Sequence, residues 1–242
     1  MARFRGVSPS TAESIAGLKD LNADEQRGGV SGQLSDILRR AIVNIDLPPG
    51  TALTESDVGN RFGVSRTPVR EAFRTLVAEG LLLILPQKGS FVSKLKRSAL
   101  QDALFIREAL ECAAGRLAVR APLEQRQQLL RIVERQREAI KYDDVAGIFQ
   151  ADEDLHRTIM VLSGHGDTWI LVQQARTHLA RLRRIANMKL KASEDALEHH
   201  AHIADAIVRG AEAETVQLLR THILQIQGFI DRIAEIYPQY IE

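Results

Sequence analysis

The segment from Thr54 to Val92 constrains the fold of this 242-residue chain most, because its capping and turn residues predict two short helices followed by a hairpin. Thr54 can cap a helix over residues 55 to 62, and Asp57, three residues later, can complete a capping box with it through reciprocal hydrogen bonds. Gly63 supplies the positive-φ residue that ends such a helix. The first element is therefore a helix of about two turns with a defined start and stop.

A second helix is expected about four residues later, as a helix-turn-helix requires. Thr67 is the expected N-cap and Pro68 the first helical residue, where no amide donor is missed. One face of this helix is apolar at helical spacing: Val69, Phe73, Leu76 and Val77. After Gly80, residues 81 to 85 predict a strand, 86 to 89 a turn and 90 to 93 the returning strand. This order predicts a winged helix-turn-helix.

The polar face of the second helix and the hairpin tip are the expected DNA-binding residues. A recognition helix enters the major groove by its N-terminal end, so Arg66, Thr67 and Arg70 are placed to reach base edges. Contacts to phosphate or backbone are expected from Arg74, Lys88 and Gly89, the last two at the tip of the hairpin. The alternative is that the arginines only form a solvated helix face.

The stretch GVSRTPVREAFRTLVAEGLLLILPQKGSFV resembles the DNA-binding domain of the GntR family of bacterial transcription regulators, and the similarity extends back through LRRAIVNIDLPPGTALTE. It covers roughly residues 31 to 94. One position departs from the family: members often carry a DNA-contacting arginine where Ser56 stands. The resemblance implies binding to double-stranded operator DNA.

Composition agrees with a soluble DNA-binding regulator. The chain is 45% apolar, and residues 31 to 94 hold eight Lys/Arg against six Asp/Glu, so the small positive excess lies in the DNA-binding part. The longest apolar run is far shorter than a membrane span, and no signal peptide is recognisable, so a cytoplasmic protein without membrane contact is expected. The single cysteine, Cys112, is expected to be a buried, inert thiol rather than a reactive one.

Three segments follow along the chain. Residues 1 to 30 are expected to form a flexible N-terminal arm that contacts DNA through Arg3 and Arg5. Residues 31 to 94 form the winged domain, and 95 to 97 a short linker. From 98 to 238 almost every break falls between long helical patterns, which predicts an all-α antiparallel bundle of about six helices. The fold class is therefore mainly α.

The predicted bundle carries a chemical signal in four polar residues that fall on apolar helix faces. Asp152 and His156 are i, i+4 on one helix, while His200 and His222 each lie at the centre of an apolar stripe on another. Taken alone, each histidine is more often a hydrogen-bonded core residue than a ligand. Four buried polar groups together are best satisfied by a divalent cation, with zinc favoured and nickel, cobalt, manganese or iron possible.

These four residues also resemble the ligand pattern of the FCD effector domain found in FadR-like GntR regulators. The pattern is D-x-x-x-H, then H-x-x-I, then a histidine near the C-terminus, and the similarity covers about residues 98 to 235. It implies a metal in the bundle with open coordination positions that a small organic acid occupies. The intact ligand set argues against the metal-free branch that binds acyl-coenzyme A.

Arg107 is the next unusual residue, because it falls within the apolar stripe of the first bundle helix, where an unpaired guanidinium is costly. It is expected to meet either Glu111, one turn away, or the carboxylate of a ligand. The family resemblance favours the ligand. Arg176 and His178 are weaker candidates for the same pocket, with packing as their alternative role.

The sequence thus predicts a homodimeric repressor that senses a small carboxylate through a metal and Arg107 and binds a near-palindromic operator. Two alternatives stay open. In one, the cation itself is the signal. In the other, the metal activates water in an enzyme fused to a DNA-binding domain, with Glu111 as the acid or base.

Overall fold

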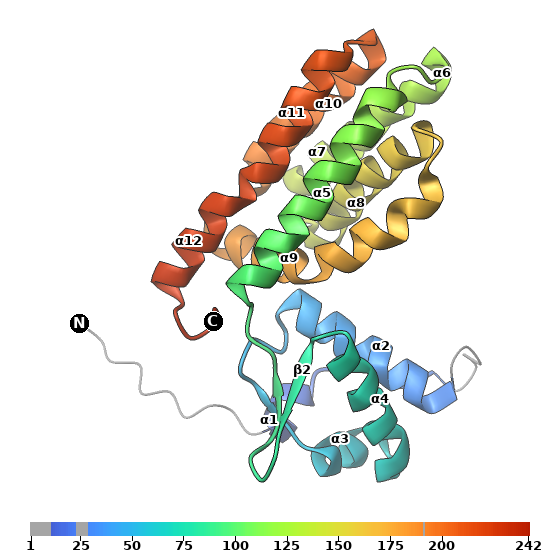
Figure 1. Ribbon diagram of the computed structural model, residues 1–242. Coiled ribbons are helices and arrows are strands. Elements are labelled where there is room, and N and C mark those ends of the chain that lie inside the picture. Colours follow the sequence, from blue (N-terminus) through green and yellow to red (C-terminus); the bar gives the residue numbers. More distant parts are fainter. Residues whose placement is uncertain (1–10, 23–28, 191) are drawn as a thin grey trace. The chain divides into compact units, whose positions relative to one another are not determined.

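The computed structural model describes residues 11–22, 29–190 and 192–242 and is mainly helical (Figure 1). It divides into two compact units. Met1–Lys96 and Ala234–Glu242 make up unit 1, and Arg97–Ile233 make up unit 2. The expected bundle, residues 98 to 238, therefore loses its last residues to unit 1. None of the helices among the described residues is long and apolar enough to cross a membrane.

The first helix of the predicted motif forms as expected. Helix α3 spans Glu55–Phe62, and the Thr54 hydroxyl accepts a hydrogen bond of 3.0 Å from the Asp57 amide. The same hydroxyl donates to Asp57 Oδ2 at 2.7 Å. Gly63 ends the helix at φ 66°, in the left-handed region where glycine carries no steric penalty.

The second helix starts earlier than expected. Helix α4 spans Arg66–Ala78 with Ser65 as N-cap, so the prediction of Thr67 as N-cap is wrong and Pro68 is the third helical residue. Proline is still tolerated there, because the first amides of a helix have no intrahelical partner. Val77, expected on the packing face, is 38% exposed.

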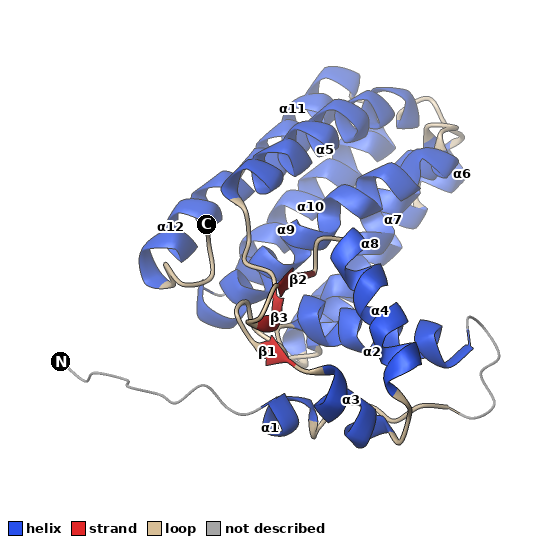
Figure 2. Cartoon of the chain, turned by 60° about the horizontal axis from the view of Figure 1, so that its bottom comes forward, coloured by secondary structure: helices blue, strands red, loops and turns tan. Residues whose placement is uncertain are grey.

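A three-stranded antiparallel sheet completes the wing (Figure 2). Strands β2, Leu82–Leu85, and β3, Gly89–Val92, form the expected hairpin, with Gln87 and Gly89 at positive φ in its turn. A short strand that the sequence did not predict, β1 at Ala52–Leu53, pairs with the other side of β3.

The core of unit 1 lies between the wing strands and helix α2, Gly29–Asn44, with α3 and α4. A segment of the expected N-terminal arm also belongs to it. Residues Thr11–Ile15 form helix α1, Ile15 is fully buried, and Leu18 and Leu21 pack against the same core. For residues 11–22 the prediction of a mobile arm is therefore wrong, because their apolar side chains are buried against the winged domain. Arg3 and Arg5 lie outside the described residues.

The segment expected to be a plain linker is paired with the other end of the chain. Leu95 is fully buried, its amide donates to the Tyr240 carbonyl at 2.8 Å, and its carbonyl accepts from the Glu242 amide at 3.0 Å. Leu95 and Ile241 form a parallel bridge. Unit 1 thus joins residues from both ends of the sequence.

Unit 2 is a helical bundle, as expected (Figure 1). Its elements are α5 Arg97–Ala118, α6 Leu123–Arg126, α7 Gln128–Lys141, α8 Val145–Leu162, a short 3₁₀ turn Gly166–Thr168, α9 Trp169–Leu190, α10 Ala192–Arg209, α11 Glu212–Leu224 and α12 Ile226–Ile236, which runs on into unit 1. Breaks at Gln127 and at Gln225 separate α6 from α7 and α11 from α12, so the described part of the bundle has more helices than the six or so expected. Helices α5 and α11 lie side by side and approach closely at Gly115, where an added Cβ would lie 2.3 Å from a Leu219 methyl group.

Candidate metal and effector site and DNA-binding surface

The four residues predicted to bind a metal lie together inside the bundle. Asp152 and His156 come from α8, His200 from α10 and His222 from α11. All four are buried, and one potential ligand atom from each lies within 4.8 Å of the others. The helical spacing alone had placed each residue on an inward face, and the packing of three helices brings them to one point.

A hydrogen bond on the outer edge of the His200 imidazole decides which of its nitrogens faces the centre. His200 Nδ1 lies 2.7 Å from the Gln136 side-chain oxygen, an acceptor, so Nδ1 carries the proton and Nε2 keeps its lone pair. That Nε2 is 3.5 Å from Asp152 Oδ1 and 3.2 Å from His222 Nε2. His156 Nδ1 makes a close contact of 2.5 Å with Glu111 Oε2, on the other edge of the ring from its Nε2.

Electrostatics keep the ligand atoms in the protonation states that a metal requires. Burial lowers the pKa of all three histidines, so they are neutral near pH 7. Burial alone would raise the pKa of Asp152, but the charges of Arg183 and Arg176 hold it well below its usual value. Neutral imidazoles and an ionised carboxylate are the forms in which these side chains bind cations.

The donor set fits a divalent ion. Three imidazole nitrogens and one carboxylate oxygen suit borderline cations such as zinc, and the Gln136–His200 bond is the kind of outer hydrogen bond that usually orients a metal-binding histidine. Without an ion the cluster is imperfectly satisfied: His222 Nδ1 is buried and has no hydrogen-bond partner among the described residues. These residues could therefore hold a divalent cation.

Arg107 lies next to this cluster and makes the internal ion pair that was one of its two expected roles. Its guanidinium donates to Glu111 Oε1 at 2.6 Å from Nε and to Oε2 at 3.3 Å from Nη2, and both side chains are buried. Nη2 is also 3.3 Å from His156 Nε2. The pair thus places a guanidinium and its carboxylate partner beside a potential metal ligand.

Helix α9 contributes two further arginines to the cluster, of which only Arg176 was predicted. Arg183 donates to both oxygens of Asp152, at 2.5 and 2.6 Å, and Arg176 donates to one of them. The two arginines are seven residues apart and so share a helix face, which was the signal available in the sequence. His178, by contrast, has no hydrogen bond to the cluster in the described part of the chain, and burial lowers its pKa to about 4.

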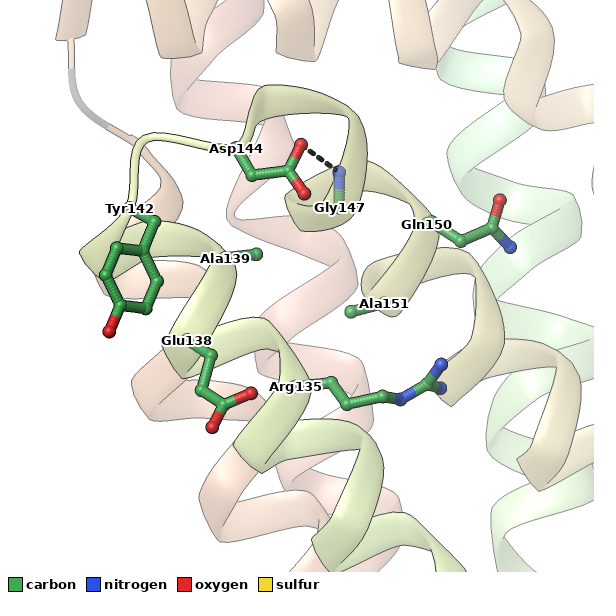
Figure 3. Close-up of a pocket in the computed structure, with 8 residues that line it drawn as sticks. All are labelled: Arg135, Glu138, Ala139, Tyr142, Asp144, Gly147, Gln150 and Ala151. Atoms are coloured by element: carbon green, nitrogen blue, oxygen red, sulfur yellow. Dashed lines mark hydrogen bonds between the residues drawn. The ribbon is translucent and has the colours of Figure 1, made fainter.

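A separate surface pocket of about 440 Å³ opens where α7 ends and α8 begins (Figure 3). Its wall includes Arg135, Glu138 and Tyr142 on one side and Asp144, Gly147 and Gln150 on the other. The Asp144 carboxylate accepts a 3.0 Å hydrogen bond from the Gly147 amide and so caps α8. None of the four cluster residues lines this pocket.

The predicted DNA-contacting residues are all exposed on unit 1. Arg66, Thr67, Arg70 and Arg74 lie along the solvent side of α4, and Lys88 and Gly89 lie at the tip of the β2–β3 hairpin. Arg70 is held in a two-pronged ion pair with Glu55 of α3, with both N–O distances at 3.0 Å. Ser56, at which the sequence departs from the family pattern described above, is exposed and follows that glutamate in α3. Sequence reasoning had missed the Glu55–Arg70 pair.

Two family models match the chain. One, described as bacterial regulatory proteins of the gntR family, covers residues 30–92, and the other, the FCD domain, covers residues 102–225. The second match spans the four buried cluster residues.

Relatives that cover most of the chain are also transcription regulators. The chain is 34% identical over 207 residues to an HTH-type transcriptional regulator in an unstable DNA locus of Streptomyces ambofaciens, covering 84% of this chain and 85% of the relative. It is 32% identical over 207 residues to the HTH-type transcriptional repressor RspR of Escherichia coli K12, covering 85% and 91%. A solved structure, a GntR transcriptional regulator from Rhodococcus sp. RHA1, shares the fold with a TM-score of 0.69 at 24% identity, over 82% of this chain and 97% of that one.

Proposed function

Since this chain belongs to the GntR family of bacterial transcription regulators and carries an FCD domain, we propose that it is a repressor whose operator binding is controlled by a small organic acid and a bound divalent metal. Like its family and its relatives, it is a transcription regulator and not an enzyme. A regulator of bacterial promoters works in the cytoplasm, which is the location we propose.

The exposed face of α4 supports the DNA-binding half of the proposal. Arg66, Thr67 and Arg70 project from the first two turns of the recognition helix, where side chains reach base edges in the major groove. Arg74 and Lys88 are placed for phosphate contacts. The net positive charge of the domain is small, so we infer that two copies bind two half-sites as a homodimer and double the number of these contacts.

The observation that carries the sensing half is the buried cluster of Asp152, His156, His200 and His222 beside Arg107. A divalent cation held by these four would supply a positively charged coordination centre for a carboxylate. The chain's own residues do the rest: Gln136 orients one imidazole, and Arg107 presents donors next to another. We assign the acid to this place, with Arg107 as its guanidinium partner.

In the proposed mechanism the acid changes the balance between two arrangements of the dimer. Operator half-sites lie a fixed distance apart, so any change in the separation of the two recognition helices alters DNA affinity. An acid that binds one arrangement better shifts the population toward it. For a repressor of this kind, acid binding lowers operator affinity.

The decisive experiment combines metal analysis with operator binding. Purified protein is analysed for bound metal by inductively coupled plasma mass spectrometry, and carboxylates are screened by thermal shift with wild type and His200→Ala. We expect about one divalent ion per chain in wild type, less in the variant, and acid-dependent stabilisation only when metal is present. Stabilisation by an acid that survives complete loss of metal would contradict the proposal.

A metal-sensing regulator is the second candidate, because the same buried cluster could report the cation itself. Gel-shift titrations with chelator and added metal, in the absence of any acid, separate the two. If operator affinity follows the metal alone, the cation is the signal; if it follows an acid at constant metal occupancy, the acid is.

A further inference from the structure

The carboxylate of Asp152 has partners on two sides. Oδ1 faces the imidazoles, 3.5 Å from His200 Nε2 and 4.0 Å from His156 Nε2. The same Oδ1 accepts a 2.6 Å hydrogen bond from Arg183 Nη2, while Oδ2 accepts from Arg183 Nη1 at 2.5 Å and from Arg176. Arg183 is thus the residue that grips the oxygen available to a metal.

Arg183 and a cation at the cluster would compete for this oxygen. A cation bound to Oδ1 would lie within a few ångströms of the Arg183 guanidinium, and two positive charges at that separation inside a protein repel strongly. Arg176 contacts only Oδ2, on the side away from the imidazoles, and can keep its bond. A bound cation therefore favours release of Oδ1 by Arg183, while the bond between Arg176 and Oδ2 is unaffected.

The charges around the cluster indicate what Arg183 would then bind. Three guanidinium groups, those of Arg107, Arg176 and Arg183, stand against two carboxylates, Asp152 and Glu111, and imidazoles that bind a cation do so in the neutral form. A divalent cation raises the excess positive charge from one to three. An acid with two carboxylates restores the original excess, whereas an acid with one does not.

We propose that Arg183 couples the two ligands of this domain: the metal displaces it from Asp152, and a dicarboxylate effector then takes it as a partner. The inference rests on the proposed function, which supplies the metal and the acid, and adds the residue that links them and the charge of the acid. Because each ligand removes an obstacle to the other, their affinities increase together, by the same factor in each direction.

The test measures zinc affinity by competition with a chromophoric chelator, alone and with succinate or butyrate, which match in chain length and differ in charge. In wild type, succinate tightens zinc binding at least about fivefold and butyrate does not. In Arg183→Gln, zinc binds roughly tenfold more tightly than to wild type without any acid, because its competitor is gone, and succinate no longer improves it.

The opposite sign would overturn the inference. If Arg183 only orients Asp152, its loss weakens zinc binding, as is usual for outer hydrogen-bonding partners of metal ligands. Equal effects of succinate and butyrate would also overturn it. Arg157→Gln, which removes an exposed arginine from the same helix as Asp152, is the matched control and leaves zinc affinity within about twofold, since its charge is screened by solvent.

A second variant and a separate readout cover the cases in which Arg183→Gln does not fold or the proposed function is wrong. If Arg183→Gln does not fold by circular dichroism, Arg183→Lys is titrated instead: lysine cannot span both oxygens, so zinc still binds more tightly than to wild type, and weaker binding contradicts the inference. Failure of the proposed function shows separately, as wild-type protein that binds no metal or an operator affinity that no acid changes.

Discussion

Gln136 of α7 and His200 of α10 are joined by a 2.7 Å hydrogen bond between the amide oxygen and Nδ1. Both side chains are buried, so the amide has no competing water and the ring has one favoured tautomer. One residue outside the four-residue cluster thus decides that the lone pair of Nε2 points toward Asp152.

Replacing this partner should weaken metal binding without unfolding the bundle. We expect Gln136→Leu to lower zinc affinity about 10- to 100-fold, because the imidazole loses the bond that fixes its tautomer and orientation. Competition with a chelator measures the change. Gln128→Leu, at an exposed position on the same helix, is the control and should leave zinc affinity unaltered; equal loss in both variants would mean that Gln136 has no orienting role.

Two glycines should respond in opposite directions to the same substitution. At Gly115 an added methyl would lie 2.3 Å from Leu219 Cδ1 and 3.2 Å from Thr215 Cγ2, so Gly115→Ala is expected to lower the free energy of unfolding by about 1–3 kcal/mol. Gly228 in α12 has nothing within 4 Å, and Gly228→Ala should raise it by about 0.5–1 kcal/mol. Urea denaturation of both variants provides the comparison, and stabilisation by Gly115→Ala would show that α5 and α11 do not pack as described.

Cys112 should be unreactive in the native protein. Burial raises the pKa of its thiol to about 11, so only on the order of one thiol in a thousand is ionised at pH 8. We expect iodoacetamide to modify it slowly at pH 8, faster as the pH rises toward 11, and rapidly after unfolding in guanidinium chloride. Mass spectrometry of the intact chain follows the modification; native labelling as fast as in the denaturant would contradict the buried position.

Two of the residues proposed to bind DNA should differ in what they contribute. Arg66 projects from the first residue of α4, and Arg66→Ala is expected to cost about 1–3 kcal/mol at the cognate operator and to relax base preference. Lys88 lies at the hairpin tip, and Lys88→Ala should weaken all sequences about equally and reduce the slope of log affinity against log salt by about 1. Fluorescence anisotropy on cognate and scrambled duplexes over a range of salt separates the two, and the reverse pattern would exchange the proposed roles.

The helix-turn-helix could be predicted from the sequence because its signals are local. Thr54, Asp57 and Gly63 lie within ten residues and define both ends of α3. Helix ends with weaker local signals were predicted less accurately. Ser65, and not Thr67, caps α4. No glycine or proline marks the breaks at Gln127 and Gln225.

Features that depend on distant partners were not predictable in the same way. Strand β1 is only two residues long and is defined by its pairing with Phe91 and Ser90. Periodicity placed Asp152 and the three histidines on inward faces. It could not show that Arg183 of α9 would form an ion pair with Asp152 of α8. This pairing depends on how the two helices pack, which the sequence of neither helix alone determines.

The pairing of Leu95 with Tyr240 and Glu242 has a consequence for the order in which the protein is assembled. During synthesis the winged segment leaves the ribosome early, while the residues that complete its unit are translated only after the whole helical bundle. The helix-turn-helix core can form at once from local contacts, but the backbone groups of Leu95 must wait until Tyr240 and Glu242 have been translated. Completion of the DNA-binding unit is therefore a late folding event, and it cannot precede synthesis of the effector domain.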